Sequence, residues 1–191
     1  MFNRLVAHWV YGGFLAGLLI LLMTPILARG WSPSLLATFL CLPAYMLHQY
    51  EEHDNDRFRR FVNSNFGKGR EILSPMAVFL INIPGVWGVI AIAFWLVVLL
   101  NPGYGLIAAY LLLLNAVIHI VSAAFLRSYN PGLVTGVLFF VPLSAWCVIA
   151  VQQSGFGSAM MHTIGLLAAI GIHAAIAIPV ILVARAGVTR A

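Results

Sequence analysis

The chain alternates long apolar runs with short breaks that carry polar and turn-forming residues. Six runs are each long enough to cross about 30 Å of hydrocarbon as a helix, because an α-helix rises about 1.5 Å per residue. They cover Leu5–Leu27, Pro33–Glu52, Pro75–Leu100, Leu106–Leu126, Leu133–Val151 and Ala159–Ala184. The pattern predicts an all-α, polytopic membrane helix bundle with six transmembrane helices, forming a single domain over residues 1–191.

Composition favours the same interpretation. Of the 191 residues, 62% are hydrophobic and 8% are charged, and the mean hydropathy is +1.00. No segment has the composition of a separate soluble domain. The first run is longer than the core of a signal peptide and lacks a small-residue cleavage site before Arg29, so we expect it to remain as a transmembrane helix.

Basic residues are distributed unevenly between the predicted loops. If the amino terminus is cytoplasmic, nine of the 10 Lys and Arg residues fall on the inner side and Arg29 alone falls on the outer side. The inner residues are Arg4, Arg57, Arg59, Arg60, Lys68, Arg70, Arg127, Arg185 and Arg190. The positive-inside rule therefore predicts that both termini are cytoplasmic and that residues 54–74 form a basic cytoplasmic loop.

The net charge of +5 has a membrane explanation. Basic segments beside a bilayer are attracted to anionic lipid headgroups. We therefore expect the lipid bilayer as a partner and no nucleic acid.

A polar segment interrupts the apolar pattern at the end of the second run. It begins at His48 and reads His-Gln-Tyr-Glu-Glu-His, and Glu51 and Glu52 are two of only five acidic residues in the chain. Ionisable groups at membrane depth are costly and mark functional sites. At about 1.5 Å per residue, His48 lies roughly 9 Å, His119 roughly 12 Å and Asn82 roughly 10 Å from the cytoplasmic boundary. Three predicted helices thus place polar groups at one level.

These groups have the composition of a metal site. A histidine with a carboxylate one turn later, and a histidine from a facing helix, are ligands that zinc or non-haem iron takes in proteins. We predict His48, Glu52 and His119 as ligands of a divalent metal, either zinc or iron. His48, Glu51 and Glu52 are the predicted catalytic residues, with Glu51 as the general base.

Structural roles for these residues are alternatives. The acidic residues from Glu51 to Asp56 are compatible with the solvated end of a helix that pairs with Arg57 or Arg60, although this leaves the deeper His48 unexplained. The pair Asn115 and His119, one turn apart, is also compatible with interhelical hydrogen bonding, which contributes about 0.6 to 2 kcal/mol.

The remaining histidines and the cysteines give weaker signals. We expect His8 and His162 to pack at helix interfaces, whereas His53 and His173 are compatible with either packing or the site. The single cysteines Cys41 and Cys147 lie inside apolar runs, where they are expected to act as small buried hydrophobes.

The motif resembles that of a known family. His48-x-x-Glu51-Glu52 near the inner end of a second hydrophobic run is similar to the HXXEE family of small bacterial membrane proteins, which is named for this motif and has no assigned activity. The later Asn115-x-x-x-His119 is compatible with the same family. The resemblance implies that His48, Glu51 and Glu52 form the active centre, and it does not name a substrate.

The resemblance extends over about residues 35–180 and includes the Tyr-Asn-Pro-Gly segment that begins at Tyr129. Tyr129, Asn82 and Asn115 are the residues expected to bind a cofactor or a substrate oxygen. The expected location is the bacterial inner (cytoplasmic) membrane, with several membrane passes.

The sequence favours a membrane-embedded, metal-dependent enzyme, either a hydrolase or an oxygenase. Its substrate would be a lipid or another hydrophobic molecule taken from the cytoplasmic leaflet, since nearly all polar residues of the spans lie on that side. One alternative is a metal-free acid/base isomerase or cyclase of isoprenoid- or sterol-like substrates. A proton-coupled transporter is another alternative, although it usually needs a polar path to both sides. An oligomer is compatible with the sequence.

Overall fold

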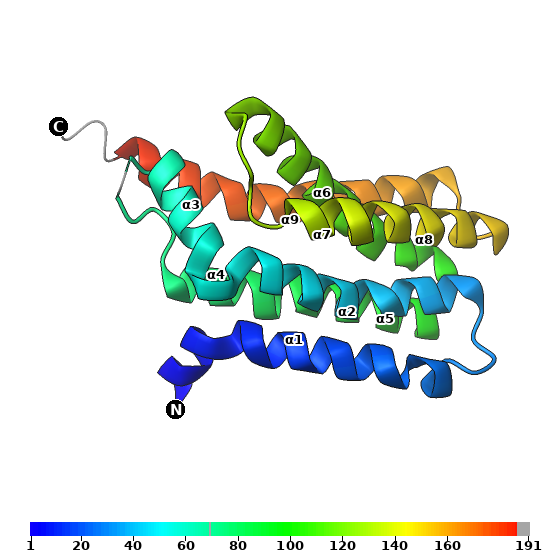
Figure 1. Cartoon of the computed structure of the whole chain (residues 1–191). Helices are drawn as coiled ribbons and strands as arrows, with labels where there is room; N and C mark the ends of the chain where they lie inside the picture. The colour runs from blue at the N-terminus through cyan, green and yellow to red at the C-terminus, as the bar shows by residue number, and fades with distance from the viewer. Residues whose placement is uncertain (69, 187–191) are drawn as a thin grey trace.

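Long antiparallel helices joined by short turns make up the chain (Figure 1). The structure is a computed structural model and describes residues 1–68 and 70–186. Within these residues there is no strand, which confirms the prediction of an all-α fold. Arg190, counted above among the inner basic residues, lies outside the described residues.

Each long helix is bounded by a short turn or a short irregular helix. In chain order the elements are α1 (Phe2–Leu27), α2 (Pro33–His53), η1 (Asp54–Asp56), α3 (Arg57–Asn65), α4 (Pro75–Leu80), η2 (Ile81–Trp87), α5 (Gly88–Leu99), η3 (Pro102–Tyr104), α6 (Gly105–Leu126), α7 (Leu133–Thr135), η4 (Gly136–Phe140), α8 (Val141–Gln153) and α9 (Ala159–Ala186). η1 and η3 are 3-10 turns. η2 and η4 are π-helical turns, which join α4 to α5 and α7 to α8.

Five segments of the described chain are long and apolar enough to cross a membrane. They are Phe2–Leu27, Pro75–Leu99, Pro102–Leu126, Leu133–Gln153 and Ala159–Ala186. The sixth predicted span is present as α2, whose 21 residues extend over about 31 Å, but its polar residues lower its hydropathy. The count of six spans therefore remains a prediction.

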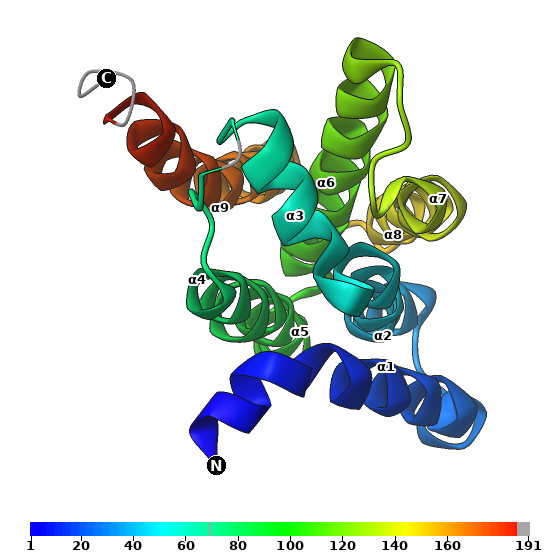
Figure 2. The same ribbon diagram turned by 60° about the vertical axis from the view of Figure 1, so that its left-hand side comes forward.

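The position of α2 explains why it tolerates polar residues. α1, α5, α6 and α8 all pack against it (Figure 2), and His48 and Gln49 are 0% and 1% exposed. A helix that is covered by other helices does not need an apolar surface toward lipid. The bundle thus buries the most polar of its long helices at its centre.

The helices α6 and α9 cross closely and then separate. At the crossing, Gly165 lies so close to α6 that a Cβ there would be 2.8 Å from the backbone of Leu106. Toward the end of the bundle that carries α3, the two helices diverge (Figure 2). On this part of α6, Val117, Val121 and Phe125 are exposed.

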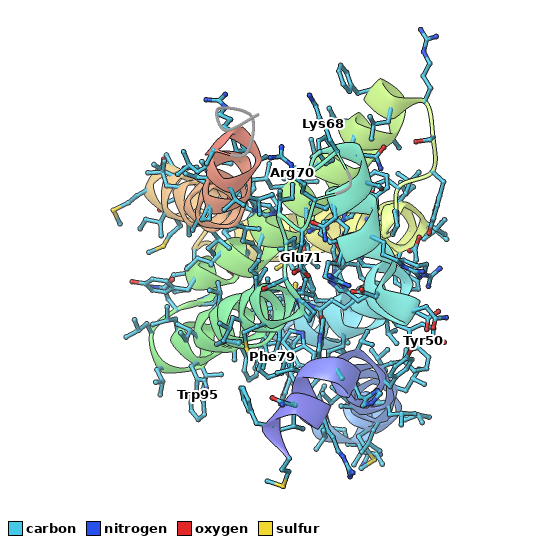
Figure 3. All side chains as sticks on the ribbon, turned by 90° about the vertical axis from the view of Figure 1, so that its left-hand side faces the viewer. Tyr50, Lys68, Arg70, Glu71, Phe79 and Trp95 are labelled. Atoms are coloured by element: carbon cyan, nitrogen blue, oxygen red, sulfur yellow. The ribbon has the colours of Figure 1, made fainter. Side chains whose placement is uncertain are left out.

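The segment between α2 and α4 lies at one end of the bundle, called here the α3 end. Lys68, Arg70 and Glu71 lie at this end (Figure 3). Arg59 forms ion pairs with Asp56 at 2.5 Å and with Glu71 at 2.6 Å. The predicted basic loop therefore contains a short helix, α3, that is fixed by ion pairs.

The crossing of α6 and α9 gives a test of the packing. Gly165→Ala should lower the free energy of unfolding by about 1 to 3 kcal/mol, because the added methyl group meets backbone atoms that cannot rotate away. Denaturation of the purified protein in mixed detergent micelles would measure the change.

Gly171→Ala in the same helix is the matched control. A Cβ at Gly171 meets nothing within 4 Å, so this variant should be neutral or up to about 1 kcal/mol more stable, since alanine favours helix. Equal changes in the free energy of unfolding for the two variants would show that α6 and α9 do not cross at Gly165.

Candidate metal centre

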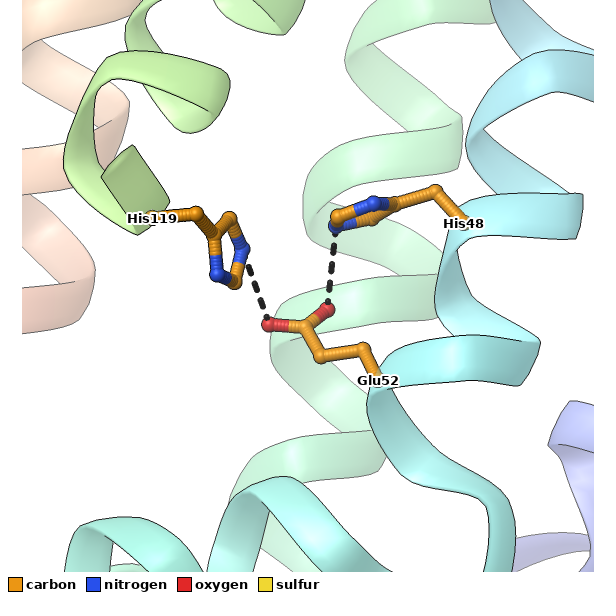
Figure 4. A group of neighbouring side chains, drawn as sticks. All are labelled: His48, Glu52 and His119. Carbon is orange, nitrogen blue, oxygen red and sulfur yellow. Dashed lines mark ion pairs between the residues drawn. The ribbon is translucent and has the colours of Figure 1, made fainter. Parts of the chain in front are cut away.

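The three predicted metal ligands lie together between α2 and α6 (Figure 4). The potential ligand atoms of His48, Glu52 and His119 are all within 4.8 Å of one another, and all three residues are buried. His48 Nε2 is 3.6 Å from Glu52 Oε2, and His119 Nε2 is 3.6 Å from Glu52 Oε1. Oε1 of the carboxylate thus faces the imidazole of His119, and Oε2 faces that of His48 and also that of His53, whose Nε2 lies 3.2 Å away.

The second nitrogen of His48 is held by a threonine of α7. The Thr135 hydroxyl donates its single proton to Glu51 Oε2, so it accepts the hydrogen bond of 2.8 Å from His48 Nδ1. His48 therefore carries a proton on Nδ1, and in the neutral ring Nε2 turns a lone pair toward Glu52. Within the described part of the chain, this buried Nε2 has no hydrogen-bond partner.

His119 is oriented in the same way by a different residue. Its Nδ1 lies 3.1 Å from the side-chain oxygen of Asn130, which accepts the hydrogen bond. Nε2 of His119 therefore also turns a lone pair toward Glu52. Asn130 is 3% exposed and belongs to the segment between α6 and α7.

That segment, residues 127–132, folds back from the end of α6 toward the bundle (Figure 1). It brings Gly132 against both imidazole rings. A Cβ at Gly132 would lie 2.7 Å from His119 Cε1 and 2.8 Å from His48 Cε1, and the backbone there has a φ of +98°. Both the space and the backbone conformation require glycine.

Glu51 lies beside the ligand cluster and points away from it. Its carboxylate accepts hydrogen bonds from the Tyr129 hydroxyl at 2.6 Å, from the Val134 amide at 3.1 Å and from the Thr135 amide at 2.7 Å, in addition to the Thr135 hydroxyl. Partial burial and the bond to Glu51 raise the pKa of Tyr129 to about 12, which keeps the phenol protonated as a donor. Glu51 is thus connected to His48 by the hydrogen bonds of the Thr135 hydroxyl. The role of Glu51 as a general base remains a prediction.

The two predicted asparagines lie near the centre without touching the ligands. Asn82 accepts a hydrogen bond from Gln49 and donates one to the Val78 carbonyl, both at 2.8 Å. Asn115 donates to the Tyr45 hydroxyl at 2.9 Å. Both asparagines line the cavity described below.

The motif and its surroundings match a family. Residues 39–147, more than half of the chain, match the family described as "Protein of unknown function with HXXEE motif". The chain belongs to the HXXEE family. The matched range contains the motif and the partners Asn130, Gly132 and Thr135. Searches of curated proteins and of solved structures gave no significant match.

A cavity of about 880 Å³ adjoins the HXXEE motif. Glu52, His119 and Asn130 form the part of its wall that belongs to the metal centre. Most of the remaining wall is apolar and comes from α3, α4, η2, α6 and α9. The exposed face of α6 at Val121 and Phe125 belongs to this wall, so the cavity extends to the exposed apolar surface of the bundle.

The other histidines divide into two groups. His53 Nε2 lies 3.2 Å from Glu52 Oε2, and His173 lines the cavity, so both adjoin the HXXEE motif. His162 instead forms a hydrogen bond of 2.7 Å with Tyr110, and the ring of His8 lies beside that of Tyr11.

The solvated-end interpretation holds for the residues that follow the motif. Asp54 forms an ion pair with Arg57 at 3.3 Å, and Asp56 pairs with Arg59. Glu52 is 5% exposed and faces histidines. The solvated-end interpretation therefore holds for Asp54 and Asp56 and fails for Glu52.

Three residues of this centre were missed by the sequence analysis as site residues: Asn130, Gly132 and Thr135. The Asn-Pro-Gly sequence signals a turn, but it does not reveal that the turn folds back into the bundle. Thr135 and Ser144 are the two hydroxyl residues of an otherwise apolar run, and a hydroxyl there was the available signal for a hydrogen-bonding role.

Gly132 gives a test of the assembled centre. Gly132→Ala should lower the free energy of unfolding by about 1 to 2 kcal/mol through its left-handed backbone and by about 1 to 3 kcal/mol more through contact with the two rings. Thermal unfolding of the purified protein would measure the sum.

Gly155→Ala separates the two effects. Gly155 has a φ of +79°, and a Cβ there meets nothing within 4 Å, so this variant carries only the backbone strain. Indistinguishable losses of stability in the two variants would show that Gly132 does not pack against the histidines.

Proposed function

We propose that the protein is a membrane-embedded, metal-dependent enzyme that acts on a lipid or another hydrophobic substrate at the cytoplasmic leaflet. The observation that carries this proposal is the orientation of two buried imidazoles, each with a lone pair directed at the same carboxylate.

The balance of donors and acceptors favours a cation at this point. The Nδ1 protons of His48 and His119 are used by Thr135 and Asn130, so lone pairs and carboxylate oxygens face each other. A single proton on Glu52 would serve only one of the two imidazoles. A divalent cation would bind both imidazoles and the carboxylate, which removes the repulsion between all three groups.

The ligand types agree with this role. Two histidines and one carboxylate are a ligand set of catalytic zinc and of non-haem iron. A cation held there would supply Lewis-acid chemistry, polarising a substrate oxygen. Thr135 and Asn130 are the outer hydrogen-bond partners that commonly orient metal-binding histidines.

The cavity supports a hydrophobic substrate. The wall of the cavity is mainly apolar. The cavity reaches Glu52 and His119 at one side and the exposed face of α6 at another. A substrate could therefore pass from the bilayer to the ligands without crossing water.

Two alternatives predict different observations. In a metal-free acid/base isomerase or cyclase, Glu52 would exchange protons with His53, which lies 3.2 Å from it. A proton-coupled transporter would need a path through the other half of the bundle, where Cys41, Leu106 and Val151 are fully buried in apolar clusters. This packing favours a one-sided site.

The metal centre can be tested by elemental analysis. Protein purified without a metal-chelating tag should contain about one equivalent of zinc or iron per chain, and His48→Ala and His119→Ala should each lose it, because two remaining ligands bind weakly. Inductively coupled plasma mass spectrometry gives both identity and stoichiometry.

His162→Ala is the control for the loss of a histidine, since His162 bonds to Tyr110. This variant should keep the metal. A wild-type protein that stays metal-free after incubation with zinc and with ferrous iron would contradict the proposal and favour the acid/base alternative. Retention of metal by both alanine variants would contradict the assigned ligands.

The proposed leaflet depends on the orientation of the bundle. The positive-inside rule places the α3 end in the cytoplasm, and we propose the bacterial inner membrane as the location. Green fluorescent protein fused after Lys68 should fluoresce, and alkaline phosphatase fused after Arg29 should be active. Exchange of the two reporters should abolish both signals, whereas phosphatase activity after Lys68 would reverse the orientation.

A further inference from the structure

A second, smaller cavity lies at the α3 end of the bundle. This groove has a volume of about 620 Å³. Helix α3 contributes Arg57, Arg60, Phe61, Asn63 and Ser64 to its lining, and the other lining residues are Tyr129 and Pro131. The last two flank Asn130 in the chain. The groove therefore lies between α3 and the segment that orients His119.

The lining of the groove is positively charged. Arg57 and Arg60 are one turn apart on α3, and none of the residues that line the groove is acidic. Within residues 1–68 and 70–186, Arg60 forms no ion pair, and its hydrogen bond goes to the backbone carbonyl of Asn55. The charge of Arg60 is therefore not neutralised by an acidic side chain of the described chain.

Arg57 offers a donor whose position is fixed. Its Nε and Nη2 donate to backbone carbonyls of Asp54 and Tyr50, and its ion pair with the Asp54 carboxylate measures 3.3 Å. Its Nη1 has no hydrogen-bond partner in the part of the chain that the structure describes. A guanidinium held in this way loses little side-chain entropy when it binds an anion.

Arg57 also lies close to the second wall of the groove. Burial and the bond to Glu51 raise the pKa of Tyr129 to about 12, and the charge of Arg57 opposes this increase. The cationic side chain of α3 and the hydroxyl of Tyr129 are thus neighbours. An anion beside Arg57 would contact both α3 and the segment that contains Asn130.

Arginine pairs favour phosphate among the possible anions. A guanidinium presents several N–H groups in a planar fork that matches the oxygens of a phosphate group. At the edge of a membrane, phosphate groups are supplied by lipid headgroups as well as by solution. The surface near the groove decides between these two sources.

That surface is apolar and aromatic. Phe61 lines the groove and also the larger cavity. At the same end of the bundle, Phe66 is 51% exposed and Phe125 is 83% exposed. Free phosphate gains nothing from such side chains, whereas the acyl chains of a lipid would cover them and gain the corresponding free energy. The surroundings therefore favour a lipid.

We propose that Arg57 and Arg60 bind the phosphate group of an anionic phospholipid in the leaflet at the α3 end. The headgroup would lie between α3 and the segment of Tyr129 and Pro131. This site uses none of the metal ligands, so it does not depend on the proposed enzymatic function. Because the lipid contacts two segments of the folded chain, its binding would also stabilise the fold.

Competition between lipids tests the site. The full chain in neutral maltoside micelles is titrated with tritiated dioleoylphosphatidylglycerol, and binding is followed by scintillation proximity. Dioleoylphosphatidylcholine, which has the same chains and phosphate but no net charge, should compete about threefold to tenfold more weakly than unlabelled phosphatidylglycerol. Inorganic phosphate at the same total concentration should not compete, because it lacks the acyl chains.

Substitutions locate the effect. Arg57→Gln and Arg60→Gln should each weaken the binding of phosphatidylglycerol by about threefold to tenfold. Arg60→Lys keeps the charge without the planar fork and should lose less than Arg60→Gln. Arg70→Gln is the matched control. Arg70 lies at the same end but bonds to the carbonyls of Gly67 and Ala184 and lines neither cavity, so this variant should bind like the wild type.

Several results would overturn the proposal. Equal competition by phosphatidylcholine would show that the groove does not select an anionic lipid, and this comparison needs only the wild type. Equal losses in Arg60→Gln and Arg70→Gln would show a diffuse attraction to basic residues. Displacement by inorganic phosphate as effective as that by phosphatidylglycerol would identify free phosphate as the ligand. Unchanged binding by both Arg57→Gln and Arg60→Gln would place the lipid elsewhere.

The site is distinguishable from the metal centre in the same experiment. Metal content is measured on each sample. Selective lipid binding by protein that lacks metal would support this site and contradict only the metal centre. Protein that contains metal but does not distinguish the two lipids would overturn this site alone.

Discussion

The site depends on one electrostatic constraint: a carboxylate is buried between two imidazole nitrogens that both bear lone pairs. Such an arrangement is unfavourable without a positive charge, because the interior does not screen the repulsion as water does. The surroundings nevertheless maintain it. Thr135 and Asn130 hold the protons of the two rings on the far nitrogens, and Gly132 fills the space between the rings without a side chain that would push them apart. The fold thus prepares the charge distribution that a divalent cation would neutralise.

The rest of the bundle follows from the need to cover this centre. α2 carries most of the polar groups and is surrounded by α1, α5, α6 and α8, which removes it from lipid. Two π-helical turns flank the centre: η2 contains Asn82, and η4 ends at Phe140, whose ring centroid is 4.3 Å from that of His48. Such turns often occur beside functional sites, where an extra residue changes which side chains face inward. On the remaining side the mainly apolar cavity reaches Glu52 and His119.

The sequence was sufficient to predict the position of a residue along its helix. It was not sufficient to predict the direction in which the side chain points around the helix axis. Helix boundaries and a fixed rise per residue were sufficient to place His48, Glu52 and His119 at one level, and the structure brings them together. Asn82 was predicted at this level, and Asn115 one turn before His119, but each asparagine bonds to other groups, since a π-helical turn and the rotation of α6 decide where they point. Glu51 shares a face with His48 by its i, i+3 spacing, yet the amide groups that begin α7 bind its carboxylate. Asn130 and Gly132 belong to an irregular segment, and the periodicity of apolar residues gives no information about how such a segment folds.

The burial of α2 has a consequence for biogenesis. If α2 crosses the bilayer, its glutamates and histidines make it a poor candidate for insertion alone, since polar residues oppose partitioning from the translocon. α1 is strongly apolar and packs along α2, so the two helices can enter together as a hairpin. The groups that later enclose Glu52 are synthesised afterwards, with His119 on α6 and Thr135 on α7. Until the ribosome has produced them, the polar side chains of α2 lack the partners that surround them in the complete bundle.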